Sequence, residues 1–182
     1  TELKVSSVSG PAGYGVNITG FNSTTVKNCI FLQQNSTVTN SPGIFAINSN
    51  NSVFSNNTIN TTGNFSYGIE LQRSNFTNIS SNFVNTTANL SYGISMLTSS
   101  YNNLTSNTVM TYGGKAVGIN LTLSSDRNII EDNTIRTVGG VSGVAYRISI
   151  LGSNNTISSN DMSFSGISDS LIYLAGGALY NN

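Results

Sequence analysis

The feature that most constrains this chain is a glycine that recurs every 25 residues. Each of these glycines precedes a β-branched residue, Ile or Val, and another apolar position follows two residues after that. The glycines are Gly43, Gly68, Gly93, Gly118 and Gly143. A fixed period of this length predicts one supersecondary unit that is stacked repeatedly, so that residues one period apart lie above one another in columns.

The spacing within each unit predicts strands. The second apolar column, two residues beyond the β-branched residue, consists of Ala46, Leu71, Met96, Leu121 and Tyr146. Apolar residues that alternate with polar ones are typical of a strand with one buried face. Another apolar pair, with a polar corner between its members, recurs from Val26–Phe31 to Ile157–Met162. Each unit therefore holds about three short strands, which bury their apolar side chains only by stacking at about 4.8 Å per coil.

These patterns predict an all-β, right-handed parallel β-helix, because parallel crossovers are overwhelmingly right-handed. We expect one domain over residues 1–182, with about six coils of about 25–28 residues and no capping helices. The expected coils lie near 15–42, 43–67, 68–92, 93–117, 118–142 and 143–170, with partial coils at 1–14 and 171–182.

Polar residues form columns at the predicted corners. The asparagine column is Asn57, Asn82, Asn107, Asn133 and Asn160, and the serine column is Ser49, Ser74, Ser99 and Ser124. Asparagine tolerates left-handed φ in tight corners, and its stacked amide can donate to the next copy. We therefore predict a structural asparagine ladder, in which Cys29 replaces asparagine in an earlier coil.

The segments SNNTI, TSNTV, EDNTI and SSNDM, together with the Gly-Ile strands, resemble the right-handed parallel β-helix superfamily with the pectate-lyase-like fold. The likeness is greatest to the Asn/Ser/Thr-rich versions in archaeal and bacterial surface proteins, and it extends from about residue 13 to 174. It implies the fold but not the function, because members include lyases, hydrolases, phage tailspikes, adhesins and plain surface repeats.

Composition narrows the classes of function. Charged residues make up 8% of the chain and balance to zero, which argues against nucleic acid or an anionic membrane as a partner. No apolar stretch has the length of a membrane span. With no histidine and one cysteine we predict no metal site, and we expect no cofactor. The hydroxyl-rich, low-charge repeats favour an extracellular or cell-surface location.

The few acidic residues offer only weak catalytic candidates. Asp132 and Asp161 flank the asparagine corner in neighbouring coils, with Arg136 nearby. Two such carboxylates could stand at the separation that glycosidases use. A solvated corner, however, provides no desolvated carboxyl, so a surface ion-pair cluster is the competing interpretation. Glu70 has no second acid in its column.

Two kinds of glycan contact are predicted. The chain holds fourteen Asn-x-Ser/Thr sequons, and we expect glycosylation on the variable corner at Asn35, Asn60, Asn64, Asn85 and Asn89. Aromatic residues also fall into columns, namely Tyr14, Tyr67 and Tyr92 before the strand glycine, and Phe76 with Tyr101. These rings can stack on one another between coils or bind sugar rings, and both interpretations stay open.

The two partial coils together have the length of one full coil. Either the chain belongs to a longer solenoid, or subunits complete one another's split coil head to tail through Leu3, Val5, Ile172, Leu174 and Leu179. The leading hypothesis is a non-enzymatic extracellular β-solenoid that polymerises with itself in a filament or sheath. The alternatives are a carbohydrate-binding or polysaccharide-cleaving β-helix, or an adhesin.

Overall fold

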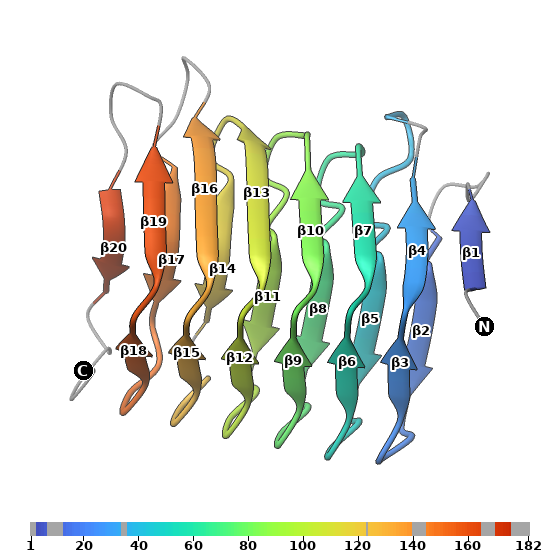
Figure 1. Cartoon of the computed structure of the whole chain (residues 1–182), viewed down its shortest axis with the longest axis horizontal. Coiled ribbons are helices and arrows are strands. Elements are labelled where there is room, and N and C mark those ends of the chain that lie inside the picture. The colour runs from blue at the N-terminus through green and yellow to red at the C-terminus, as the bar shows by residue number, and fades with distance from the viewer. Residues whose placement is uncertain are drawn as a thin grey trace.

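The computed structural model of this chain describes residues 3–6, 13–33, 36–122, 124–139, 145–164 and 170–175. Within these ranges the chain forms three parallel sheets and no helix. Successive strands belong to different sheets, so each coil contributes one strand to every sheet and the coils stack along one axis (Figure 1). The predicted all-β parallel solenoid of about six coils, with three strands in each, is confirmed.

We name the three sheets A, B and C. Sheet A contains β1 (Leu3–Ser6), β4 (Cys29–Leu32), β7 (Thr58–Thr61), β10 (Phe83–Thr86), β13 (Thr108–Gly113), β16 (Thr134–Gly139) and β19 (Asp161–Phe164). Sheet B contains β2 (Val16–Thr19), β5 (Ile44–Ile47), β8 (Ile69–Gln72), β11 (Ile94–Leu97), β14 (Val117–Leu121), β17 (Tyr146–Ile150) and β20 (Ser170–Leu174). Sheet C contains β3 (Thr25–Lys27), β6 (Val53–Ser55), β9 (Asn78–Ser80), β12 (Asn103–Thr105), β15 (Ile129–Glu131) and β18 (Thr156–Ser158).

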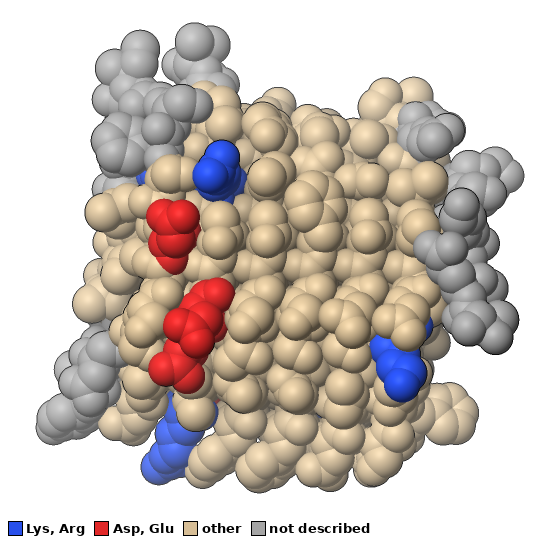
Figure 2. Space-filling view, viewed as in Figure 1, with Lys and Arg blue, Asp and Glu red and all other residues tan. Residues whose placement is uncertain are grey.

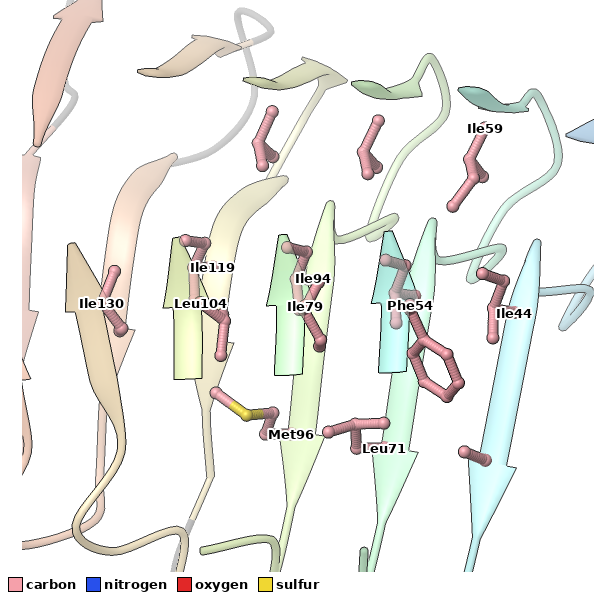
Figure 3. Packing of buried hydrophobic residues seen from close by; sticks show 14 of the residues in the cluster. Ile44, Phe54, Ile59, Leu71, Ile79, Ile94, Met96, Leu104, Ile119 and Ile130 are labelled. Carbon is pink, nitrogen blue, oxygen red and sulfur yellow. The ribbon is translucent and has the colours of Figure 1, made fainter. Parts of the chain in front are cut away.

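The coils are numbered by their sheet B strand, so coil one begins with β2, coil five with β14 and coil six with β17. Each sheet sends one face of its strands inward, where side chains of neighbouring coils stack (Figure 3). Ile94 of sheet B, Leu104 of sheet C and Val109 of sheet A are all fully buried. This continuous apolar core exists only because the coils stack, as the repeat requires.

The recurrent glycine lets sheets A and B approach closely. A Cβ atom added at Gly68 would collide with the Val84 side chain and lie 2.6 Å from the carbonyl oxygen of Gly93. Such a distance leaves no room for any side chain, so glycine is needed here for close packing and not for a turn.

The strict 25-residue period fails between coils five and six. Strand β17 pairs with β14 so that Ile119 faces Ile148 and Leu121 faces Ile150. The prediction that Tyr146 continues the Leu121 column is therefore wrong, and Gly143 lies outside the described residues. The offset from Ile119 to Ile148 is 29 residues, because one extra residue lies between β14 and β15 and three more lengthen the turn before β17. The total shift of four is even, so it preserves the alternation of faces. Ile148 and Ile150 consequently fill the core, and both are fully buried.

Two corner predictions need a similar correction. The serine column runs from Ser99 to Ser125 and not to Ser124, because the Ser99 amide donates to Ser125 Oγ at 3.3 Å. The left-handed φ at the other corner belongs to the residue before each ladder asparagine, as at Asn56 with φ 54°. The preceding residue makes the turn, which leaves the ladder side chain free to point into the corner.

The end strands extend the columns of their sheets. Leu3 pairs with Cys29, in the asparagine column, and Val5 pairs with Phe31 of the core. At the other end Ile172 pairs with Ile148, and Leu174 pairs with Ile150. Leu179 lies outside the described residues.

Candidate functional site

The weak catalytic candidates lie on exposed surface. Asp132 occupies the left-handed corner position with φ 54°, Asp161 begins β19, and Arg136 points outward from β16. All three are exposed, and Figure 2 shows the acidic side chains of this face near its C-terminal coils, with basic side chains there and at the opposite, N-terminal end. Neither of the two grooves described below includes them. The described residues also contain no group of three potential metal ligands.

The asparagine column forms a hydrogen-bonded ladder inside the corner. Asn107 is fully buried, and its Oδ1 accepts hydrogen bonds from the backbone N and from Nδ2 of Asn82, both at 3.0 Å. Its Nδ2 donates to the Ile79 carbonyl at 2.8 Å and to Asn133 Oδ1 at 3.0 Å. Each asparagine thus links neighbouring coils and has no free group for a ligand, which makes the column structural.

The predicted glycosylation sites fall into two environments. Asn60 and Asn85 face each other in the register of β7 and β10, and both are half-buried. Asn64 and Asn89 are exposed in turns, and Asn89 Oδ1 accepts a hydrogen bond from the Gly114 amide at 2.7 Å. Asn35 lies outside the described residues. Glycosylation itself remains a prediction.

Aromatic rings stack between coils on the outer side of sheet B. Three pairs are present, with ring centroids 4.9 Å apart for Tyr14 and Phe45, 4.9 Å for Tyr67 and Tyr92, and 4.6 Å for Tyr146 and Tyr173. Ring–ring packing, one of the two interpretations of the tyrosine column, is therefore present. Each ring packs one face against its partner, so its edge and its other face are not used by the pair.

A separate aromatic pair occupies a different corner. Phe76 and Tyr101 stack at 5.0 Å, and the Arg127 guanidinium lies 5.4 Å from the centre of the Tyr101 ring. Both rings are strongly exposed, at 55% and 46%. They form an exposed ridge that lies outside both grooves described below.

One groove of about 220 Å³ borders the first two ring pairs. It is lined by Tyr14, Asn40, Pro42, Phe45, Phe65, Tyr67, Glu70 and Gln72. Burial raises the pKa of the Glu70 carboxyl, and the 2.8 Å hydrogen bond from Gln72 Nε2 partly opposes that rise. Burial, followed by the nearby Tyr92 and Glu70, raises the pKa of Tyr67 to about 12.

A larger groove of about 340 Å³ lies between the second and third ring pairs. It is lined by Leu90, Tyr92, Lys115, Val117, Asn120, Tyr146 and Ser149. The tyrosine column indicated this face, but a constant 25-residue period aligns Asn120 with Ala145, whereas the structure aligns Asn120 with Ser149. The lengthened turn therefore concealed this groove from sequence reasoning.

The arrangement of three parallel sheets around a stacked core defines a parallel β-helix. The chain belongs to the family described as the right-handed β-helix region, whose model matches residues 14–182. A search of curated proteins finds no match. Among the described residues, no helix is both long enough and apolar enough to cross a membrane.

A solved structure shares this fold. The chain is similar to a mutant of the periplasmic alginate epimerase AlgG, with a TM-score of 0.51 and 14% sequence identity. The match covers 93% of this chain but only 48% of the epimerase structure. At this identity the likeness shows the fold alone.

Proposed function

We propose that this chain is a saccharide-binding β-helix of the cell surface or extracellular space. The observation that carries the proposal is the outer side of sheet B, where stacked aromatic rings border two grooves that also contain polar side chains. Aromatic faces pack against the C–H faces of sugar rings, and nearby amide and hydroxyl groups bind sugar hydroxyls.

The combination of groups favours sugars over other ligands. The chain carries fourteen charged residues, of which two, Glu70 and Lys115, line these grooves. A highly charged partner such as nucleic acid would require a basic surface. The structural neighbour is described as an alginate epimerase, which is consistent with a β-helix that accommodates a polysaccharide.

The proposed role is binding and not cleavage. Glycosidases use two carboxyl groups about 5–9.5 Å apart. Glu70 is the one carboxylate that lines the smaller groove, and the larger groove is lined by none. The exposed Asp132 and Asp161 lie outside both grooves, so their position gives no support to a hydrolytic mechanism.

Binding to a glycan array, followed by calorimetry on the ligands that bind, tests this proposal. We expect defined oligosaccharides to bind, and we expect Tyr67→Ala to weaken binding while Phe76→Ala, which removes an exposed ring outside both grooves, leaves it unchanged. An assay for new reducing ends or unsaturated uronates is expected to stay negative. Equal weakening by both variants would contradict a site on sheet B.

Head-to-tail assembly is the second candidate function. Ile172 and Leu174 continue the inward columns of sheet B but are 40% and 53% exposed. A further coil, from a second copy or from a longer chain, would bury these side chains. Electron microscopy at high protein concentration tests the assembly, because single monodisperse particles without fibres would contradict a filament.

A further inference from the structure

We propose that coil five contains a binding slot for one pyranose ring, between Tyr92 and Tyr146 and above Val117. This inference deepens the proposed saccharide binding and rests on it. It identifies which part of the sheet B face receives a sugar ring and which residues contact that ring.

The first support is that coil five contributes no ring to this face, whereas the rings of the other coils occupy two neighbouring columns, that of Val117 and that of Asn120. Coils one to four each contribute one ring to the outer side of sheet B, and coil six and β20 do so again. The rings are Tyr14, Phe45, Tyr67, Tyr92, Tyr146 and Tyr173. In coil five the corresponding positions hold Val117, which pairs with Tyr146, and Asn120, which pairs with Ser149.

The second support is the space at this position. Tyr92 and Tyr146 are two coils apart, which corresponds to about 10 Å along the axis. The larger groove, of about 340 Å³, lies between them with Val117 in its lining. This volume falls within the range of roughly 300–1,000 Å³ that is typical of small-molecule sites.

The third support is a pair of buried polar side chains that line the groove. Asn120 is 7% exposed and Ser149 is 5% exposed. Within the described part of the chain, neither the Asn120 amide nor the Ser149 hydroxyl has a hydrogen-bond partner. Neither side chain is among those whose polar atoms are buried without a partner, so both present their polar atoms to the groove, where hydroxyl groups of a ligand would bond them.

A pyranose ring fits these features better than a purely apolar ring. Its two C–H faces would pack against the rings of Tyr92 and Tyr146, while hydroxyls at its edge would bond Asn120 and Ser149. Lys115, which also lines the groove and is exposed, adds a donor at the rim. A flat hydrocarbon ring would cover the Asn120 and Ser149 side chains without bonding to them.

The test introduces a tyrosine at position 117, so that its ring occupies the slot and blocks the sugar. Val117→Tyr places in coil five the residue that Tyr92 and Tyr146 already supply in the same column, so the variant is expected to fold with an unchanged or higher melting temperature. Val117→Thr keeps the slot open and is the matched control. The probes are hexasaccharides of β-1,4-linked glucose, N-acetylglucosamine and uronic acid, with affinity measured by calorimetry.

We expect native protein and Val117→Thr to bind at least one hexasaccharide with dissociation constants within twofold, and Val117→Tyr to bind it at least about tenfold more weakly, since two ring contacts are lost. Binding by Val117→Tyr within twofold of native would overturn the slot but leave the proposed function intact. If no hexasaccharide binds native protein, the slot is overturned for these sugars, and the glycan array decides the proposed function separately.

A second variant keeps the test decisive if Val117→Tyr unfolds. Asn120→Ala removes a lining amide without adding volume, and we expect it to weaken binding of the same hexasaccharide by several-fold. Unchanged affinity in a folded Asn120→Ala variant would overturn the slot. Tyrosine emission gives an independent readout of ligand contact with the rings, because the chain contains no tryptophan.

Discussion

At the scale of single residues, asparagine side chains stabilise this fold by hydrogen-bonding backbone polar groups at the corners. A coil must turn between sheets without leaving buried amides unpaired, and the asparagine side chain supplies both a donor and an acceptor there. Asn82, Asn107 and Asn133 repeat the same bonds from coil to coil. The ladder therefore links neighbouring coils by hydrogen bonds, in a chain that has few charged residues for ion pairs.

Removing one ladder side chain should destabilise the whole stack. Asn107→Ala removes the side-chain acceptor of the Asn82 backbone amide, one of the two acceptors of Asn82 Nδ2, and the side-chain donor to the Ile79 carbonyl, so we expect the free energy of unfolding to fall by about 2–5 kcal/mol. Urea denaturation measures the loss. As a control, Ser106→Asn at the neighbouring exposed position with φ 55° should change stability by less than about 0.5 kcal/mol. Equal effects would show that the ladder bonds contribute little.

Glu70 should make stability depend on pH. Burial raises its folded-state pKa above 4.5, so between pH 4.5 and the raised value the native state binds more protons than the unfolded state. The contribution of Glu70 to the free energy of unfolding is therefore largest below pH 4.5, and it is lost as pH rises through the folded-state pKa. We expect Glu70→Gln to be more stable than native protein at pH 7 and to lose that advantage below pH 4.5, with exposed Asp161→Asn as control. An advantage that persists at low pH would contradict burial as the cause.

At the scale of elements, strand β17 shows how the solenoid absorbs an insertion. The turn before it is longer than in other coils, yet Ile148 and Ile150 take the core positions and Tyr146 keeps its ring outside. Pairing in a parallel sheet is decided by which face of the strand is buried, and a shift by an even number preserves that face. The same shift creates the larger groove by placing Tyr146 beside Val117.

Truncation in β17 distinguishes the observed register from a strict 25-residue period. Ile150→Ala should lower the unfolding free energy by about 2–5 kcal/mol, because it opens a cavity in a filled core. Tyr146→Ala should cost less, about 0.5–1.5 kcal/mol, since it removes a ring pair on the outside of sheet B. A larger cost for Tyr146→Ala than for Ile150→Ala would indicate that Tyr146 occupies the core.

The whole molecule is a one-dimensional stack in which each coil contacts only its neighbours. Central coils have a neighbour on both sides, whereas strands at the ends of the sheets have one, and β20 leaves Leu174 53% exposed. Stability in such stacks is approximately a sum of coil and interface terms. Local opening should therefore begin at the ends and cost most in the middle.

Hydrogen exchange of the native protein should show this gradient. We expect the slowest backbone amide exchange in β8 and β11, intermediate rates in β5 and β14, and the fastest in β2 and β20. Mass spectrometry of peptides after timed exchange measures the rates. Uniform protection along the axis would contradict the nearest-neighbour description, or would indicate that further coils cover the ends.

The sequence by itself determined the architecture, because the 25-residue glycine and the period-two apolar columns permit few other folds. It also located the asparagine column, since a corner that must bond its own backbone selects that side chain. Local patterns were sufficient here because every coil must bury the same apolar strand faces and pair the same backbone groups at its corners. Columns of identical residues therefore revealed the stacking directly.

Only the tertiary structure decided the register beyond coil five and the composition of the sheet B grooves. The length of an irregular turn carries no periodic signal, so the sequence could not show that Asn120 lies beside Ser149 or that Tyr146 flanks Val117. Left-handed turn positions were misplaced by one residue for a similar reason, because φ depends on how the whole corner closes. A binding face assembled from adjacent coils depends on these alignments, which the packing of the core decides.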